Sequence, residues 1–354
     1  MTTPSVLSGG QRHRGRHRRP GRGRRQRRQR DRPQLPVAAA GLTLVLGVAI
    51  LLVVMAGGAS GPALRSKTEG RVAQARPARA VAWPVVPAAY AVTPAPPTEQ
   101  VRIHLLEPLT SGLLFNVRTG QVLWERDPER VLPIASLTKM MTALIVATLD
   151  RPKARVLITR AAVDFTGSGV GLLPLHKRVP LEALLYGLLL PSGNDAAIAL
   201  AQHVAGTQSG FIAMMNARAR AMGLGCTHYT TVSGVIDAGN HSCAADLAKI
   251  ARAVLDERRL ARIVGSASAV VPFPIKGHKL YLYNNNPLYQ LGYPGVDGVK
   301  TGYTTAAGVC LVATARRGRS WLGVVLLHSA DEDDQAPELL NAGFAALRGG
   351  ENFG

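Results

Sequence analysis

Aromatic residues and cysteines are scarce in this chain. Phe, Trp and Tyr make up 5% of its 354 residues, and three cysteines are too few for the dense disulfide framework of a small secreted scaffold. No two histidines have the His-Glu-x-x-His spacing of a zinc protease. Glycine and proline follow no Gly-X-Y period, which excludes a collagen-like fibre. With 47% hydrophobic residues, the chain is long enough to bury a sizeable core.

Charge of either sign is absent from residues 33–64. Within that stretch, residues 37–59 are almost wholly apolar, and as a helix they match the roughly 30 Å hydrocarbon core of a bilayer. Residues 1–36 hold twelve Arg and one Asp, so we expect a disordered cytoplasmic arm followed by a single transmembrane helix. This predicts a cell-membrane protein whose remainder is extracytoplasmic. The alternative is a cleaved signal peptide, cut near residues 55–60.

The net charge of +20 arises largely from this arm. The arm contains no aromatic residue on which bases could stack, so we expect contact with anionic lipid and no nucleic-acid partner. Residues 60–100 contain seven prolines without a helical period, which predicts an extended extracytoplasmic tether.

Residues 101–350 have the patterns of one folded domain. Alternating apolar residues at 113–117 and 121–125 flank Arg118-Thr119-Gly120 and predict a hairpin. A second hairpin is expected from strands at 308–315 and 321–328. Helices are expected at 135–149, 180–190, 195–205, 211–222, 243–255 (with Ser242 as N-cap) and 335–347. The fold class is therefore α/β (α+β), with an antiparallel sheet built from N- and C-terminal hairpins and a helical cluster inserted between them.

Three short strings occur once each, in the order Ser136-Leu137-Thr138-Lys139, Ser192-Gly193-Asn194 and Lys300-Thr301-Gly302. The spacing of the first brings the amine of Lys139 to the hydroxyl of Ser136 on one helical face. A neutral amine there can accept the proton of a nucleophilic serine. Burial and a second cation, for which Lys300 is the candidate, would lower the pKa of Lys139 enough to make it neutral.

These strings resemble those of the low-molecular-mass penicillin-binding proteins that are serine D-alanyl-D-alanine carboxypeptidases, the peptidase S11-like family. The resemblance extends over about residues 103–348 and is carried by the residues at 133–143, 192–197, 244–248 and 297–304. It implies a β-lactamase/transpeptidase-like fold and requires no metal or cofactor. Members often carry a second β-rich domain and a C-terminal amphipathic helix, and we expect the N-terminal segment to replace them.

The resemblance also implies the chemistry. Ser136 would form the acyl-enzyme with Lys139 as its general base, Ser192 would relay the proton to the leaving D-alanine, and Asn194 would hold the substrate amide. On the strand of the third string, Lys300 and Thr301 would receive the terminal carboxylate, and Gly302 would allow close approach. The backbone N–H groups of Ser136 and Tyr303 would form the oxyanion hole.

The function expected is removal of the terminal D-alanine from peptidoglycan stem peptides, with β-lactams as covalent inhibitors. A D,D-endopeptidase with the same site and a non-catalytic module that binds cell-wall peptides are the alternatives. No Glu-x-x-Leu-Asn string follows Asn194, which disfavours a β-lactamase. The segment 233–237 replaces a His-Gly-Leu-like turn of the family.

The three cysteines lie outside the cell on this topology, where disulfides persist. Cys226 and Cys243 flank an irregular segment, so a bridge between them is one possibility; the other is that all three are small buried residues. Cys310 lies in an apolar strand and is expected to be buried. The run Asn284-Asn285-Asn286 is expected either to shape the cleft wall or to form a turn.

Overall fold

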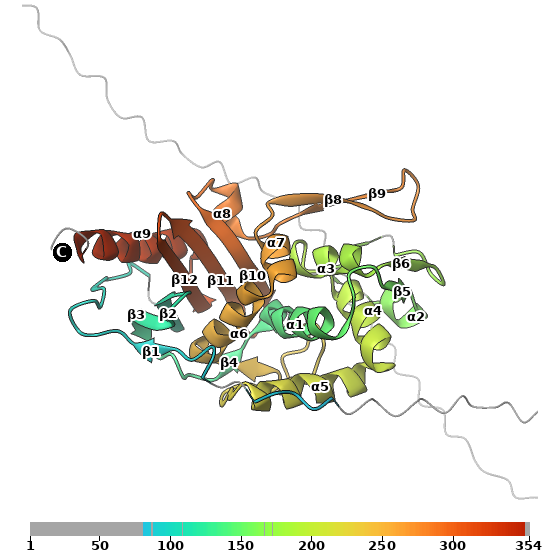
Figure 1. Cartoon of the computed structure of the whole chain (residues 1–354), viewed down its shortest axis with the longest axis horizontal. Coiled ribbons are helices and arrows are strands. Elements are labelled where there is room, and N and C mark those ends of the chain that lie inside the picture. The colour runs from blue at the N-terminus through green and yellow to red at the C-terminus, as the bar shows by residue number, and fades with distance from the viewer. Residues whose placement is uncertain (1–80, 86–87, 108, 166, 172, 351–354) are drawn as a thin grey trace, which may run out of the picture. The chain divides into compact units, whose positions relative to one another are not determined.

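The computed structural model describes residues 81–85, 88–107, 109–165, 167–171 and 173–350 (Figure 1). The arm expected at 1–36 and the membrane segment expected at 37–59 lie outside these residues. Among the helices that are described, none has both the length and the apolar character needed to span a bilayer. All described residues belong to one unit, Arg71–Gly354.

Six of the described strands form the main sheet, in the order β1-β3-β2-β12-β11-β10. Their bounds are β1 (Thr93–Pro94), β2 (Ser111–Asn116), β3 (Gln121–Arg126), β10 (Val296–Thr304), β11 (Gly308–Arg317) and β12 (Ser320–Ser329). Neighbours are antiparallel except for the short parallel pairing of β1 with β3. The sheet thus joins an N-terminal and a C-terminal hairpin, as the sequence predicts.

Side chains alternate between the two faces of this sheet because a strand has a period of two. Leu114, Leu311 and Val324 are buried on the face covered by α9 (Glu332–Gly350). Their neighbours in sequence, such as Leu113, Val312 and Val325, are buried on the opposite face, in a larger core shared with the helices. The sheet is therefore buried on both faces and holds β10 rigidly at its edge.

The helical cluster is inserted between the two hairpins and lies to one side of the sheet (Figure 1). Its helices are α1 (Lys139–Leu149), α2 (Arg160–Val163), α3 (Leu181–Leu189), α4 (Asn194–Ala205), α5 (Gln208–Ala221), α6 (Ala244–Asp256) and α7 (Arg258–Val264). The short helix α8 (Pro287–Gln290) packs instead with α9. Short strand pairs join β4 (Leu132–Pro133) to β7 (His241–Ser242), β5 (Arg155–Leu157) to β6 (Arg178–Pro180), and β8 (Ser268–Pro272) to β9 (Lys279–Tyr283).

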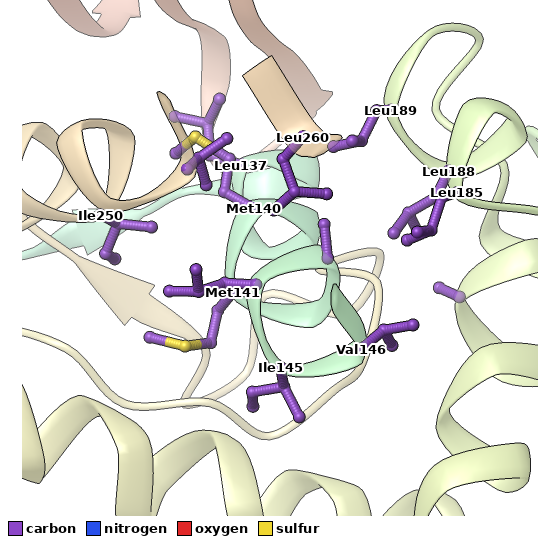
Figure 2. Packing of buried hydrophobic residues seen from close by; sticks show 14 of the residues in the cluster. Leu137, Met140, Met141, Ile145, Val146, Leu185, Leu188, Leu189, Ile250 and Leu260 are labelled. Atoms are coloured by element: carbon purple, nitrogen blue, oxygen red, sulfur yellow. The ribbon is translucent and has the colours of Figure 1, made fainter. Parts of the chain in front are cut away.

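Helix α1 lies at the centre of this cluster. Figure 2 shows Met140, Met141 and Val146 of α1 among apolar side chains of the surrounding helices, including Leu188 and Ile250. The first eight residues of α1, Lys139 to Val146, are all buried. A helix buried on all sides is fixed in position by packing, so the residues at its start are held rigidly.

Local differences from the sequence expectations have structural reasons. The helix expected from residue 135 begins as a 3₁₀ turn, η1 (Ala135–Thr138), and becomes α-helical at Lys139. The N-cap of α6 is Cys243 and not Ser242, because Ser242 pairs within β7 and its hydroxyl bonds to Thr227 instead.

Part of the segment expected to be a tether is docked on the domain. Thr93 and Ala95 donate backbone hydrogen bonds to the hairpin carbonyls of Gly120 and Val122. Arg252 of α6 donates to the carbonyl of Ala91 and also to those of two residues in the hairpin turn. The folded unit therefore includes residues from before position 101, since Ala95 and its neighbours supply apolar contacts as well as strand pairing.

Candidate active site

Ser136 and Lys139 lie at the junction where η1 passes into α1. Because Lys139 follows Ser136 by three positions, about one helical turn, the side chains meet, and Lys139 Nζ is 2.7 Å from Ser136 Oγ. Lys139 is fully buried, whereas Ser136 is partly accessible. A nucleophile at the surface of a cavity with an amine directly beneath it is the geometry that the first string predicts.

The hydrogen-bond partners of Lys139 Nζ allow it to act as an uncharged amine. Three oxygens lie 2.7 Å from Nζ, on Ser136, Asn194 and the backbone of Ser233. The amide oxygen of Asn194 and the carbonyl oxygen of Ser233 can only accept, so they take two N–H bonds. A neutral amine then has one lone pair left, and the hydroxyl of Ser136 is the one partner of the three that can donate to it.

Electrostatics act in the same direction. Burial lowers the pKa of Lys139 well below its ordinary value, the positive charge of Lys300 lowers it further, and Asp195 opposes the shift. Lys300 is itself buried, and burial lowers its pKa from 10.5 to about 7. Its Nζ donates a hydrogen bond to the backbone carbonyl of Thr301, 2.9 Å away. Two lysines are thus held in one desolvated place that disfavours their charged forms.

The second string forms the connection from α3 to α4. Ser192 has a φ of 68°, a left-handed conformation that a non-glycine residue adopts only where its surroundings enforce it. Asn194 begins α4 and accepts from Lys139. Asp195 follows and accepts hydrogen bonds from the backbone N–H groups of Val170 and Gly171. This carboxylate therefore fixes the loop that brings Ser168 to the cavity.

The third string lies on β10, the last strand of the sheet, and no other described strand pairs with its outer side. An extended peptide can add to such an edge. A Cβ at Gly302 would lie 3.0 Å from the backbone nitrogen of Ser136 and 3.1 Å from the carbonyl oxygen of Ile134. Glycine is needed here because β10 approaches η1 so closely. The ring of the next residue, Tyr303, is largely exposed.

These parts surround one cavity of about 370 Å³. Ser136, Ser192, Thr301, Gly302 and Tyr303 line it, whereas Lys139, Asn194 and Lys300 lie buried behind its wall. Cavities of about 690 and 680 Å³ lie elsewhere in the described part of the chain, and neither is lined by any residue of the three strings. The chemistry, and not the volume, identifies the site.

The loop that contains Ser233 supports Lys139, although no side-chain motif in the sequence reveals this loop. Ser233 acts through its backbone carbonyl, and Val232 likewise accepts from the hydroxyl of Thr142 on α1. Asn240 donates to the hydroxyl of Thr138, 2.8 Å away. One indication of this loop is present in the sequence, namely that residues 233–237 replace the family's usual turn. Any residue type can supply a backbone acceptor, so no motif in the sequence marks it.

The asparagine run shapes the cleft and caps a helix. Asn285 lines the cavity and donates from its backbone N–H to Leu190, which ties β9 to the second string. Asn286 caps α8 by accepting from Leu288, and its side-chain amide donates to the carbonyl of Gly298 on β10. Of the two interpretations that the sequence left open, a place in the cleft wall holds for Asn285, whereas Asn286 is in an extended conformation and is the N-cap of α8.

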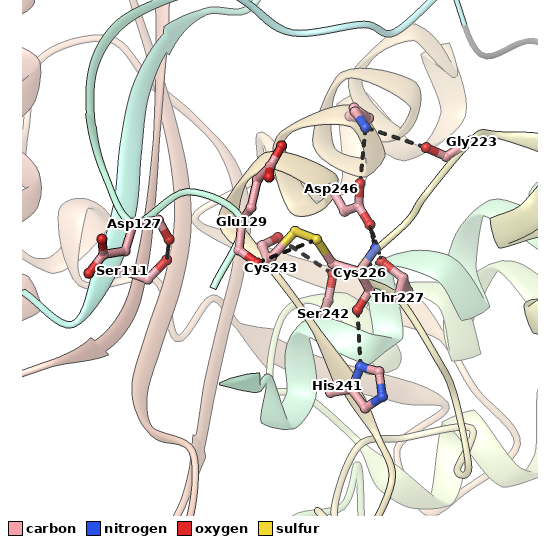
Figure 3. Close-up of a disulfide and its surroundings, with 11 residues drawn as sticks. Ser111, Asp127, Glu129, Gly223, Cys226, Thr227, His241, Ser242, Cys243 and Asp246 are labelled. Atoms are coloured by element: carbon pink, nitrogen blue, oxygen red, sulfur yellow. Dashed lines mark hydrogen bonds and ion pairs between the residues drawn. A yellow bond between two sulfur atoms is a disulfide. The ribbon is translucent and has the colours of Figure 1, made fainter. Parts of the chain in front are cut away.

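Cys226 and Cys243 form a disulfide (Figure 3). Cys310 is a buried free thiol, as expected for a small residue in an apolar strand. Asp246 lies close to the two bridged sulfurs, but sulfurs joined to each other are not thiolate ligands for a metal ion. Asp246 instead accepts from the Cys226 N–H and from the hydroxyl of Thr227, and pairs with Lys249.

Several known proteins are similar to this chain in sequence and in fold. The model of a family described as D-alanyl-D-alanine carboxypeptidase, peptidase S11, matches residues 109–331. D-alanyl-D-alanine carboxypeptidase DacF of Bacillus subtilis is 34% identical over 213 residues, which are 59% of this chain and 54% of DacF. A D-alanyl-D-alanine endopeptidase of Pseudomonas aeruginosa is 32% identical over 242 residues, covering 68% and 77% of the two chains.

Among solved structures, that of a D-alanyl-D-alanine carboxypeptidase from Mycobacterium tuberculosis superposes with a TM-score of 0.64. It is 34% identical and covers 70% of this chain and 94% of its own. Against several curated relatives the match is shorter, and the chain spans about half the length of DacF.

Proposed function

The chain belongs to the D-alanyl-D-alanine carboxypeptidase family of serine peptidases, peptidase S11, and from that membership we propose that it removes the terminal D-alanine from peptidoglycan stem peptides. The observation that carries the proposal is the fully buried amine of Lys139, which lies 2.7 Å from the hydroxyl of Ser136. This arrangement has no value for stability alone, since burying an amine is unfavourable.

In the first half-reaction, Ser136 Oγ attacks the carbonyl carbon of the penultimate D-alanine as its proton passes to Lys139 Nζ. The negative charge that develops on the carbonyl oxygen is stabilised by the backbone N–H groups of Ser136 and Tyr303. The C–N bond then breaks, and the departing amine takes the proton from Lys139 through Ser192. In the second half-reaction, water attacks the acyl-enzyme and releases the shortened peptide and Ser136.

The substrate is held between two walls. Its backbone pairs with the free edge of β10, and the amide of Asn194 contacts the peptide from the other side. Lys300 and Thr301 receive the terminal carboxylate. A β-lactam, which presents an amide carbonyl and a carboxylate in similar positions, acylates the same serine.

A D,D-endopeptidase is the second candidate, and one observation favours it: the relative from Pseudomonas aeruginosa, 32% identical to this chain, bears that name. The same serine and the same base serve both reactions. The two reactions therefore differ only in the leaving group, which is free D-alanine in one case and a cross-linked peptide in the other.

The test is to incubate the purified protein with a stem pentapeptide and with a cross-linked peptide dimer, and to identify the products by mass spectrometry. Loss of one D-alanine from the pentapeptide supports the carboxypeptidase, and conversion of the dimer to monomers supports the endopeptidase. The Ser136→Ala variant must be inactive on both. If wild type cleaves neither but still binds the peptides, the protein is a binding module.

For its location, we propose that residues 37–59 anchor the protein in the cell membrane as a single helix, with the catalytic unit outside. The charge-free apolar run and the twelve arginines before it support this orientation. Membrane fractionation tests it: protein that resists extraction by carbonate and alkali supports the anchor. A released chain whose N-terminus lies near residue 60 indicates cleavage instead.

A further inference from the structure

The cavity that contains Ser136 is lined by one carboxylate, that of Glu332. The other described side chains that line it are uncharged at neutral pH, and the buried Lys300 lies behind the wall. The one formal charge at this surface is therefore negative, although the proposed substrate ends in a carboxylate.

The position of Glu332 is fixed by the way α9 begins. The hydroxyl of Ser329 donates to Gln335 Oε1, 2.6 Å away, and Gln335 Nε2 donates to the carbonyl of Glu107. Gln335 is buried, so these bonds hold the first turn of α9 against the body of the domain. Glu332 is the first residue of that turn and faces the cavity, whereas Asp333 and Asp334 are exposed.

Glu332 lines the same cavity as Thr301, one of the two residues proposed to receive the terminal carboxylate. Cys310 lines the cavity beside it and is the direct partner of Gly302 across β10 and β11. The pKa of the Cys310 thiol is raised mainly by burial, and the nearby negative charges of Asp237 and Glu332 add to the effect. Glu332 is thus close to the strand that carries Thr301.

The environment of Glu332 keeps its charge from being fully screened. Burial raises the pKa of this carboxyl, and repulsion from Asp333 and Asp331 raises it further. A carboxylate that is partly removed from water interacts with a neighbouring charge more strongly than an exposed one does. It therefore opposes the attraction that Lys300 exerts on a bound carboxylate.

From this arrangement we propose that Glu332 is a specificity-determining residue that sets the charge selectivity for the leaving group. It weakens the binding of peptides with a free carboxylate after the scissile bond, relative to peptides that carry an amide or an ammonium group there. This inference rests on the proposed function and names the class of leaving group that the same site accepts.

The experiment compares two matched peptides, diacetyl-L-Lys-D-Ala-D-Ala and its C-terminal amide, in the wild type and in Glu332→Gln. Removing the charge is expected to raise kcat/KM for the free acid by about five- to tenfold, mainly through KM, and to change that for the amide less than twofold. Glu332→Lys should shift the ratio further in the same direction.

Asp333→Asn and Asp334→Asn are the controls, because each removes an equal charge from the same helical turn at an exposed position. They are expected to change the ratio less than twofold, since exposed charges are screened. If Asp333→Asn changes the ratio as much as Glu332→Gln does, or if neither changes it, the inference is wrong. A wild type that cleaves neither peptide contradicts the proposed function itself.

Discussion

At the scale of single residues, the account depends on the protonation of two buried lysines. Lys139 and Lys300 are both almost completely buried, yet they have different surroundings. Lys139 has three oxygens around its nitrogen, two of which can only accept hydrogen bonds. Lys300 bonds to one backbone carbonyl, that of Thr301, which lines the cavity. The first is suited to accept a proton and the second to meet an anion.

If the neutral amine is the base, Lys139→Arg cannot replace it, because a guanidinium stays protonated at any pH at which the protein is folded. We expect the second-order rate of acylation by a fluorescent penicillin to fall about a thousandfold or more. The reaction is stopped at successive times, and the rate is measured from the fluorescence of the labelled protein on a gel. The melting temperature of the variant serves as the folding control. Acylation at the wild-type rate would remove Lys139 from its role.

The second residue-scale prediction concerns pH. Lys300 carries its charge below its pKa of about 7 and loses it as the pH rises through that value. The ratio of kcat/KM for the free-acid peptide to that for its amide should therefore decrease between about pH 6 and pH 8, because only the acid needs the cation. Lys300→Met should abolish this step, while Glu332→Gln should retain it. A step that persists in Lys300→Met would assign the titration to another group.

At the scale of elements, the loop from Cys226 to Cys243 supports the start of α1. Its backbone and Asn240 bond to Lys139, Thr142 and Thr138. A Cβ at Gly234 would lie within van der Waals overlap of the carbonyl of Ala135, so the loop packs against η1 without a gap. The disulfide closes this loop at its two ends, where Figure 3 shows Asp246 and His241 bonded around it.

Opening this disulfide is expected to lower both stability and activity. Because the cysteines have a sequence separation of 17, loss of the bridge in Cys226→Ser/Cys243→Ser should decrease the free energy of unfolding by about 3 kcal/mol. The acylation rate should fall because the Ser233 carbonyl is held less firmly. Denaturant unfolding and penicillin labelling measure the two effects. A reductant should lower the stability and the acylation rate of the wild type but should not change those of the double variant. If the reductant affects both proteins equally, its effect arises from Cys310.

The elements differ in how far sequence could predict them. The helix that carries Ser136 and Lys139 and the two hairpins were predictable, because a local spacing or a period of two determines them. The β8–β9 hairpin was not, since its alternating Lys279, Tyr281 and Tyr283 are exposed and only one face contributes to the core. The proximity of Lys300 to Lys139 joins residues far apart in the chain, so no local pattern determines it; the need for a second cation and the resemblance to a family indicated it.

Two other features of the site give no clear signal in the sequence. A backbone acceptor such as Ser233 leaves residue type unconstrained, as the replacement of the family's usual turn here illustrates. Glu332 resembles the acidic residues that commonly begin a helix, where they interact favourably with the helix dipole. Only the packing of α9 on the sheet distinguishes Glu332 from Asp333 beside it.

At the scale of the whole molecule, residues 81–85 and 88–100 are part of the folded unit. Tyr90 donates to Asp256 on α6, and the guanidinium of Arg218 lies 5.0 Å from the ring centroid of Trp83. These contacts lie on helices of the cluster and on the β2–β3 hairpin, away from the three strings. We therefore expect the docked segment to contribute stability and no catalysis.

The variant Arg252→Ala tests whether the docked segment contributes to stability and not to catalysis. It removes three hydrogen bonds to carbonyls of the docked segment and the hairpin turn, so the melting temperature should fall by about 2–4 °C. The kcat on the pentapeptide should not change. Arg118→Ala is the matched control, because Arg118 takes part only through its backbone carbonyl. A lower kcat of Arg252→Ala, measured at a saturating concentration of the pentapeptide, would link the docked segment to the active site.

The central claim is that the hydroxyl at position 136 is the nucleophile and that the amine three residues later activates it. Mass spectrometry of the intact protein after exposure to a β-lactam, followed by peptide mapping, tests this most directly. One adduct per chain is expected, on the peptide that contains Ser136, with none on Ser136→Ala and only a trace on Lys139→Ala in the same time. An adduct on a different residue, or equal labelling of the three proteins, would contradict the account.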